Sequence, residues 1–268
     1  MRKKTPIIKQ EMLLLDNSFE RLQQLKNQYK DQTVYIVGTG PSLKNYNLIK
    51  LKNFLKDKFV IGLKQSYDIL EDVADIHLLN FCNYTPTKYN KIKNTIISWI
   101  VFAPNHPHDI INNNIPCDFM LPLCRNNGDY HNTLAGKKDF ENLLIENSFD
   151  RPWGSGIMYE GGIPLALYCG CKKIITLGWD IGSINPDDYK NNKSSYSHFY
   201  KSELINNKTK DSIGYEEANI VVNSTEDLYK FLQNINVELN IVSDINPAHK
   251  SIPRIEIPEI QNNLLNTL

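Results

Sequence analysis

The stretch "VYIVGTGPSLKNY", residues 34–46, decides the fold. An apolar strand runs into Gly38 and Gly40, and Pro41 follows, where a helix can begin because its missing amide proton would be unpaired there anyway. Glycines at the carboxyl end of a strand let the backbone approach a ligand closely, and the amides of a helix start attract an anion. The sequence therefore predicts a strand, a turn and a helix from about Ser42. The turn is either a ligand site or only a tight corner.

The turn lacks the complete signature of either common nucleotide motif. Leu43 stands where a dinucleotide fingerprint has its third glycine, and no Gly-Lys-Ser or Gly-Lys-Thr ending makes a P-loop. This excludes a standard NAD site and a Walker site. The amides of the helix start, with the hydroxyls of Thr39 and Ser42, are expected to face a phosphate.

Short apolar segments recur along the chain and alternate with helical stretches. Their apolar residues are bunched, as in strands covered on both faces. The predicted strands are Thr33 to Val37, Lys58 to Lys64, Asp75 to Phe81, Thr95 to Ala103, Lys173 to Leu177 and the last strand, 238–244. This pattern predicts an α/β protein with a single Rossmann-like, doubly wound, mostly parallel sheet and helices on both faces.

The same pattern suggests how the chain is divided. We expect an N-terminal amphipathic helix within 1–32, one nucleotide-sugar transferase domain over 33–252 and a C-terminal tail over 253–268. Inside the domain, 104–151 is expected to be an irregular, lid-like excursion, and 182–202 a mobile substrate loop, because both are polar and rich in Asn, Pro or Ser.

Three helical signals support this division. Apolar residues recur at steps of three and four before the first strand, which indicates one amphipathic helix. A later helix is expected to end near Gly170, and another to open with a capping box from Ser224 to Asp227. The apolar positions of the first helix are Met12, Leu15, Phe19, Leu22, Leu25 and Tyr29.

Composition restricts the partners. The 268 residues carry 30 Lys and Arg and 30 Asp and Glu, so there is no basic field of the kind that gathers nucleic acid, and we expect no nucleic-acid partner. We find no signal peptide and no apolar run long enough to span a membrane, which leaves peripheral membrane association open. We expect a homo-oligomer, with the N-terminal helix as a candidate interface.

Cysteine usage indicates a reducing compartment. An odd number of cysteines with no repeated spacing favours reduced, buried thiols over a disulfide framework, so we expect a cytoplasmic protein. The five are Cys82, Cys117, Cys124, Cys169 and Cys171.

Polar residues follow several of the predicted strands. Lys64, Gln65 and Asn80 come directly after apolar runs, and ligands of open α/β sheets lie at the carboxyl ends of the strands. Farther along, His198 in "SSYSHFY" could act as a general base near neutral pH, with Tyr196 beside it. For each of these residues, an ordinary strand end or surface loop is the competing interpretation.

Metal ligands are sparse. There is no Asp-x-Asp, the only adjacent aspartates are Asp187 and Asp188, and the pair His106 and His108 has no nearby carboxylates. Transferases that release a nucleoside diphosphate commonly need a divalent cation, whereas a monophosphate leaving group can be stabilised by amides and hydroxyls. We therefore expect no metal and no cofactor.

The ordered blocks resemble a known family. "VYIVGTGPSLKNY", the strand ends at Gln65 and Asn80, "LALYCGCKKIITLGWDI" and the downstream "SHFY" resemble the bacterial sialyltransferases of glycosyltransferase family 42. They are similar almost to the same degree to the related MptE-like, 6-hydroxymethylpterin diphosphokinase-type domain. The resemblance covers roughly Thr33 to Tyr200 in scattered blocks.

The sialyltransferase resemblance implies an inverting, metal-independent transferase. It would move a sialic-acid-like, nonulosonic or Kdo-type sugar from a CMP-activated donor to a glycan hydroxyl, in polysaccharide biosynthesis. His198 would be the base and Tyr196 would support the leaving phosphate. The implied nucleotide-sugar contacts are Gly38, Thr39, Gly40, Ser42, Lys64, Gln65, Asn80, Ser155, Gly156 and Asp180.

The sequence departs from that family at three of its motif positions. Thr39 and Lys64 stand where the family has asparagines, and Gly182 where it has a tyrosine. Two alternatives therefore stay open: an ATP- and Mg²⁺-dependent diphosphokinase with carboxylates such as Asp180 as metal ligands, and a non-catalytic nucleotide-sugar-binding module.

Overall fold

The computed structural model describes residues 5–79, 95–102, 117–124, 129–145, 151–152, 154–182, 213–243 and 246–262. Within these ranges one sheet of eight parallel strands forms in the order β6-β5-β4-β3-β2-β1-β7-β8. The strands are β1 Thr33–Val37, β2 Phe59–Leu63, β3 Ile76–Leu79, β4 Ile96–Phe102, β5 Phe119–Cys124, β6 Arg151–Pro152, β7 Lys173–Leu177 and β8 Glu238–Val242. The predicted Rossmann-like α/β fold is confirmed.

The strand order contains one reversal. The chain builds outward from β1 to β6 on one side and then returns to place β7 on the other side of β1. At the carboxyl ends, Val37 is the register partner of both Gly62 and Leu177. Ligands of open α/β sheets bind at such a reversal, because the loops after the two central strands diverge there.

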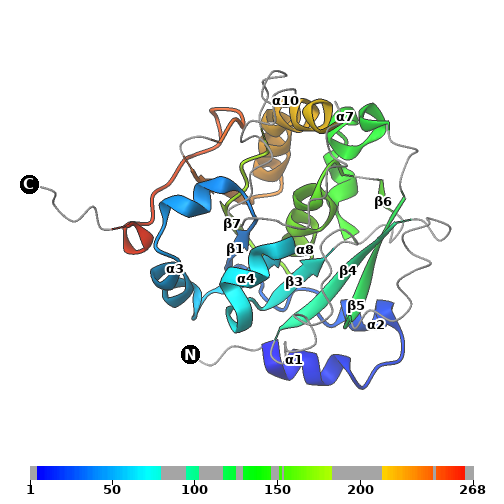
Figure 1. Cartoon of the computed structure of the whole chain (residues 1–268). Helices are drawn as coiled ribbons and strands as arrows, with labels where there is room; N and C mark the ends of the chain where they lie inside the picture. The colour runs from blue at the N-terminus through cyan, green and yellow to red at the C-terminus, as the bar shows by residue number, and fades with distance from the viewer. Residues whose placement is uncertain are drawn as a thin grey trace, which may run out of the picture.

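Helices cover both faces of the sheet (Figure 1). Val34 and Ile36 of β1 belong to a buried cluster shared with α8 (Ile163–Tyr168) and α10 (Ile213–Asn234). Val37 belongs to a second cluster with α3 (Leu48–Leu55), α4 (Tyr67–Leu70) and the short helix η10 (Pro258–Ile260). Both faces of the central strands are therefore buried, which explains their bunched apolar residues.

The sequence did not predict two of the strands, β5 and β6. Both lie in or at the end of the stretch 104–151, so the expectation that this stretch is irregular throughout is wrong. β5 lies inside that stretch and pairs with β4 in parallel, and the two-residue β6 pairs with β5 at its end. Pro122 sits within β5, and a proline argues against a strand in a sequence pattern because it cannot donate to the ladder. Near the edge of this sheet, beside only two residues of β6, the missing donor is tolerated.

The predicted N-terminal helix is present but is split in two. α1 (Thr5–Met12) and α2 (Ser18–Gln23) are separated at Asn17, whose extended backbone lets its side chain accept from the Phe19 amide at 2.7 Å. A single continuous helix is therefore wrong, since Asn17 caps a new one. Of the expected apolar face, Met12, Leu22, Leu25 and Tyr29 are buried, whereas Phe19 is exposed.

Polar contacts anchor α1 to the sheet. Thr5 donates to the Asp75 carboxylate, and Lys9 pairs with Asp118 at 2.9 Å while donating to the Thr95 carbonyl at 2.7 Å. The helix therefore packs on its own domain. The expected oligomer interface stays a prediction.

Helix α10 corrects the expected capping box. The helix begins at Ile213, so Ser224 lies in its middle and donates to the Val221 carbonyl at 2.8 Å instead of capping a terminus. The predicted end of α8 is confirmed, because α8 stops at Tyr168 and Gly170 follows with a φ of +84°.

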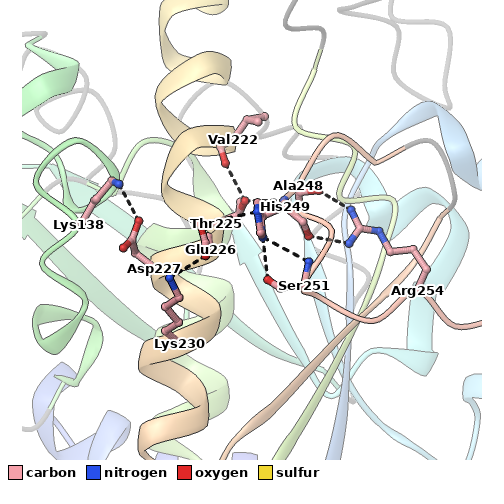
Figure 2. Close-up of polar contacts among 10 residues, drawn as sticks. All are labelled: Lys138, Val222, Thr225, Glu226, Asp227, Lys230, Ala248, His249, Ser251 and Arg254. Carbon is pink, nitrogen blue, oxygen red and sulfur yellow. Dashed lines mark hydrogen bonds and ion pairs between the residues drawn. The ribbon is translucent and has the colours of Figure 1, made fainter.

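The segment that follows β8, residues 246–254, contacts α10, and we call it the clip (Figure 2). Arg254 donates to the carbonyls of Ala248 at 2.6 Å and His249 at 2.9 Å, and the His249 amide donates to Thr225 of α10 at 2.9 Å. The backbone of Arg254 also forms a parallel β-bridge with that of Ile241 in β8. As far as residue 262, the expected tail is therefore a fixed part of the domain.

Candidate active site

A cavity of about 250 Å³ opens at the carboxyl ends of β1, β2 and β7, where the strand order reverses. Four separate segments and one helix face build its walls, which is the arrangement expected for a ligand site of this fold. They are the turn 38–41, Leu63 and Lys64, residues 155–159, residues 178–182, and Glu217, Ala218 and Val221 of α10.

Most of the predicted contact residues meet in this cavity. Ser42 and Gln65 do not line it, and Asn80, Tyr196 and His198 lie outside the described residues. That the residues bind a nucleotide sugar stays a prediction. Those that line the cavity are Gly38, Thr39, Gly40, Lys64, Ser155, Gly156 and Asp180.

The two glycines of the first turn pack against the loop after β7. Their amides donate to Leu177 and Gly178 carbonyls, each at 2.8 Å. A Cβ on Gly38 would lie 2.5 Å from the Gly178 oxygen, and one on Gly40 would lie 2.3 Å from Oδ2 of Asp180. Glycine is required here by the neighbouring backbone itself, so the turn is a tight corner that also forms one wall of the cavity.

The amide expected to be free for a phosphate is already bonded. Ser42 lies in the short helix η1 (Pro41–Asn45), and its N–H donates to Oδ2 of Asp180 at 2.7 Å. The expectation that this amide is free is therefore wrong, because the carboxylate of the chain itself occupies that position. Burial raises the pKa of Asp180, and the hydrogen bond from the Ser42 amide opposes the rise.

The opposite wall begins with two left-handed residues. Ser155 has a φ of +64° and Gly156 a φ of +95°, and the Gly156 carbonyl accepts from the amides of Tyr159 and Glu160. The Ser155 hydroxyl donates to the Thr133 hydroxyl at 2.7 Å. This bond fixes the turn that opens the helical segment leading to α8.

Two aromatic residues, Tyr159 and Trp179, are part of the cavity lining. The rings of Tyr159 and Trp179 meet edge to face with centroids 6.2 Å apart. The Tyr159 hydroxyl lies 3.1 Å from that of Ser224, and burial raises the pKa of Tyr159. Asn246 of the clip donates to the Trp179 carbonyl. The clip therefore holds both this wall and α10.

The charges around the cavity are unevenly placed. Among its described lining residues, Lys64 is the one cation, and it follows β2, whereas Asp180 and Glu217 are carboxylates from the β7 loop and α10. Trp179 could have been inferred from its place beside Asp180. Glu217 could not, because it precedes the start that the sequence predicted for its helix.

Metal ligands do not gather among the described residues, which hold no group of three or more His, Cys, Asp or Glu suited to an ion. The pairs His106–His108 and Asp187–Asp188 lie outside those residues. In the part of the chain that is described, none of the helices has the length and apolar character of a membrane span.

Comparison with known proteins finds similarity of structure but none of sequence family. No family profile matches the sequence, and no curated protein matches it. The structure is similar to that of the MAf glycosyltransferase from Magnetospirillum magneticum AMB-1, with 14% identity and a TM-score of 0.42 over 94% of this chain and 38% of that one. The chain thus spans well under half of that protein's length.

Proposed function

We propose that this protein is a glycosyltransferase that binds a nucleotide-activated sugar in the cavity at the β1/β7 reversal. One observation carries the proposal: seven residues expected to contact the donor, far apart in sequence, line a single cavity at the place where this fold binds ligands. The lining combines apolar and aromatic residues with a few charged ones, as small-molecule sites generally do.

The donor that the resemblance to glycosyltransferase family 42 implies is a CMP-activated sialic-acid-like sugar. In the reaction, the acceptor oxygen forms a bond to the anomeric carbon while the bond from that carbon to the phosphate oxygen breaks and CMP leaves. His198 would take the proton of the acceptor hydroxyl, and Tyr196 would donate to the departing phosphate. Because Asp180 already holds the Ser42 amide, phosphate contacts fall to other residues of the cavity.

A donor screen tests this proposal. Purified protein is incubated with CMP-Neu5Ac, CMP-Kdo or UDP-sugars, each with and without EDTA, and release of the nucleotide is measured. Turnover of a CMP-sugar that survives EDTA is the expected result. Turnover lost in EDTA would overturn the metal-free mechanism, and thermal stabilisation only by ATP with Mg²⁺ would favour the diphosphokinase instead.

The role of His198 has a matched control. His198→Ala is expected to lower turnover by about 10²- to 10⁴-fold, the usual contribution of a general base. His131→Ala removes an exposed histidine outside the cavity lining and should leave turnover unchanged. Binding of CMP-sugar without turnover in the unmodified protein would indicate a binding module.

A further inference from the structure

Lys64 holds an unusual backbone conformation at the cavity wall. It follows β2 directly and has a φ of +53°, in the left-handed region that disfavours residues with a Cβ. Such conformations persist only where the surrounding structure enforces them, and they concentrate at functional sites. At Lys64, a hydrogen bond to its own carbonyl holds the left-handed conformation.

That carbonyl is bonded to a buried histidine of the next strand. Nε2 of His77, in β3, lies 2.7 Å from the Lys64 oxygen, and the His77 side chain is fully buried. Since a carbonyl only accepts, Nε2 carries the hydrogen. Burial lowers the pKa of His77 to about 4, so the ring is a neutral, permanent donor near neutral pH.

The ring itself cannot turn freely. Gly62 is the register partner of His77, and a Cβ there would lie 2.7 Å from Nδ1. The Tyr67 ring also packs edge to face against the His77 ring, with centroids 5.8 Å apart. Packing therefore aims Nε2 at the Lys64 carbonyl.

The cavity's charges assign a role to the lysine. Among the described lining residues, Lys64 is the one cation, and the carboxylates of Asp180 and Glu217 belong to other walls. An anionic group of a ligand is attracted to Lys64 and repelled by those carboxylates. A lysine ammonium is a common phosphate contact.

We propose that Lys64 is the anion-binding residue of the cavity and that His77 is a positioning residue that holds its left-handed turn. The inference rests on the proposed function in one respect, since the anion would then be the phosphate of the nucleotide donor. It adds a residue, His77, that touches no ligand.

The lysine is tested by comparing CMP with cytidine, which lacks the phosphate. Lys64→Asn removes the charge but tolerates a positive φ. It is expected to weaken CMP binding at least about tenfold and to leave cytidine binding unchanged. Lys44→Asn is the control, because Lys44 is an exposed lysine of the neighbouring η1 that does not line the cavity. Equal CMP affinity in Lys64→Asn would overturn the assignment.

The histidine is tested by two amides of different reach. The nitrogen of His77→Gln approximates Nε2, whereas that of His77→Asn is one bond shorter and cannot reach the Lys64 carbonyl. The backbone chemical shifts of Lys64 and the three-bond coupling between its amide and α protons report its φ. They should indicate the left-handed conformation in His77→Gln but not in His77→Asn. The preference for CMP over cytidine should follow the same order. Retention of both in His77→Asn would overturn the positioning role.

Two further measurements use the unmodified protein. The Hε2 proton of His77 should exchange slowly with solvent, and inorganic phosphate should shift the Lys64 resonances saturably. Should no nucleotide bind, the proposed function fails, yet a saturable phosphate shift at Lys64 would still support an anion site. Absence of that shift would overturn it.

Discussion

The amide of Ser42 donates to Oδ2 of Asp180 across 2.7 Å and ties the turn after β1 to the loop after β7. These two loops flank the reversal of the strand order and both line the cavity, so the bond holds two of its walls together. A helix start in such a fold often offers its amides to a ligand's anion. Here the anion at Ser42 belongs to the protein.

Removing the Asp180 carboxylate should destabilise the fold. Asp180→Ala leaves the buried Ser42 amide without its acceptor, and the free energy of unfolding is expected to fall by about 1–3 kcal/mol. Asp180→Asn keeps an acceptor oxygen and should lose less. Urea unfolding of the three proteins measures the order, and equal stability of Asp180→Ala and the unmodified protein would contradict it.

The same carboxylate should give stability a pH dependence. Because burial raises its pKa in the folded state, folded protein binds more protons than unfolded protein between the ordinary carboxyl pKa and the raised one. The free energy of unfolding of the unmodified protein, minus that of Asp180→Asn, should therefore decrease as pH rises through that window. Unfolding of both proteins from about pH 3 to about pH 6 measures the difference. A difference that grows with pH would reverse the sign argued here.

We predict that Gly40 is required because a Cβ would clash with its neighbours, and not because of its backbone conformation. Its φ of −65° is one that any residue adopts, yet a Cβ would lie 2.3 Å from Asp180 Oδ2 and 2.7 Å from the Gly178 oxygen. Gly40→Ala should cost about 1–3 kcal/mol or more of unfolding free energy, since backbone must shift. Gly40→Ala combined with Asp180→Ala relieves only one contact, so the combined loss should be smaller than the sum. Strict additivity would show that the two residues do not share this packing.

The fold could be predicted from the sequence because its central strands are buried on both faces. β1 and β7 have the predicted bounds, and β2 to β4 differ from them by only a few residues. β5 was hidden by Pro122, and the start of α10 by a serine that resembles a cap but bonds within the helix. Local signals fail where a residue's partner is decided by the tertiary structure.

The site could be predicted only in part for the same reason. The glycine turn was found, but the partner of its Ser42 amide lies 138 residues away along the chain. No local pattern reports such a bond. The sequence does not reveal the contact of His77 with Lys64 either. A single histidine in an apolar strand is usually just a buried side chain that makes a hydrogen bond. Only the pairing of β2 with β3 brings it to Lys64.

Arg254 should be the main support of the clip. It donates to carbonyls at Asn246, Ala248, His249 and Ile252, over distances of 2.5–3.1 Å. Arg254→Ala leaves these acceptors without the guanidinium and should lower the unfolding free energy by at least about 2 kcal/mol.

Arg254→Lys is the matched control for charge. Its single ammonium cannot reach four carbonyls at once, so its melting temperature should lie between those of the other two proteins. If Arg254→Lys were as stable as the unmodified protein, the positive charge alone, rather than the planar group, would hold the clip.

The buried thiols should report unfolding. Cys169 and Cys171 are both buried, and burial raises the pKa of Cys171 to about 12 and that of Cys169 as well. At about pH 8 only on the order of 10⁻⁴ of such a thiol is thiolate, the reactive form. In a variant whose other cysteines are serine, Ellman's reagent should therefore label neither thiol in buffer and both in denaturant. Because both thiols are buried, the reagent reaches them only when the surrounding structure opens, so the labelling rate in dilute denaturant should follow the unfolding equilibrium. Rapid labelling in buffer would instead require a local opening around the connection between α8 and β7.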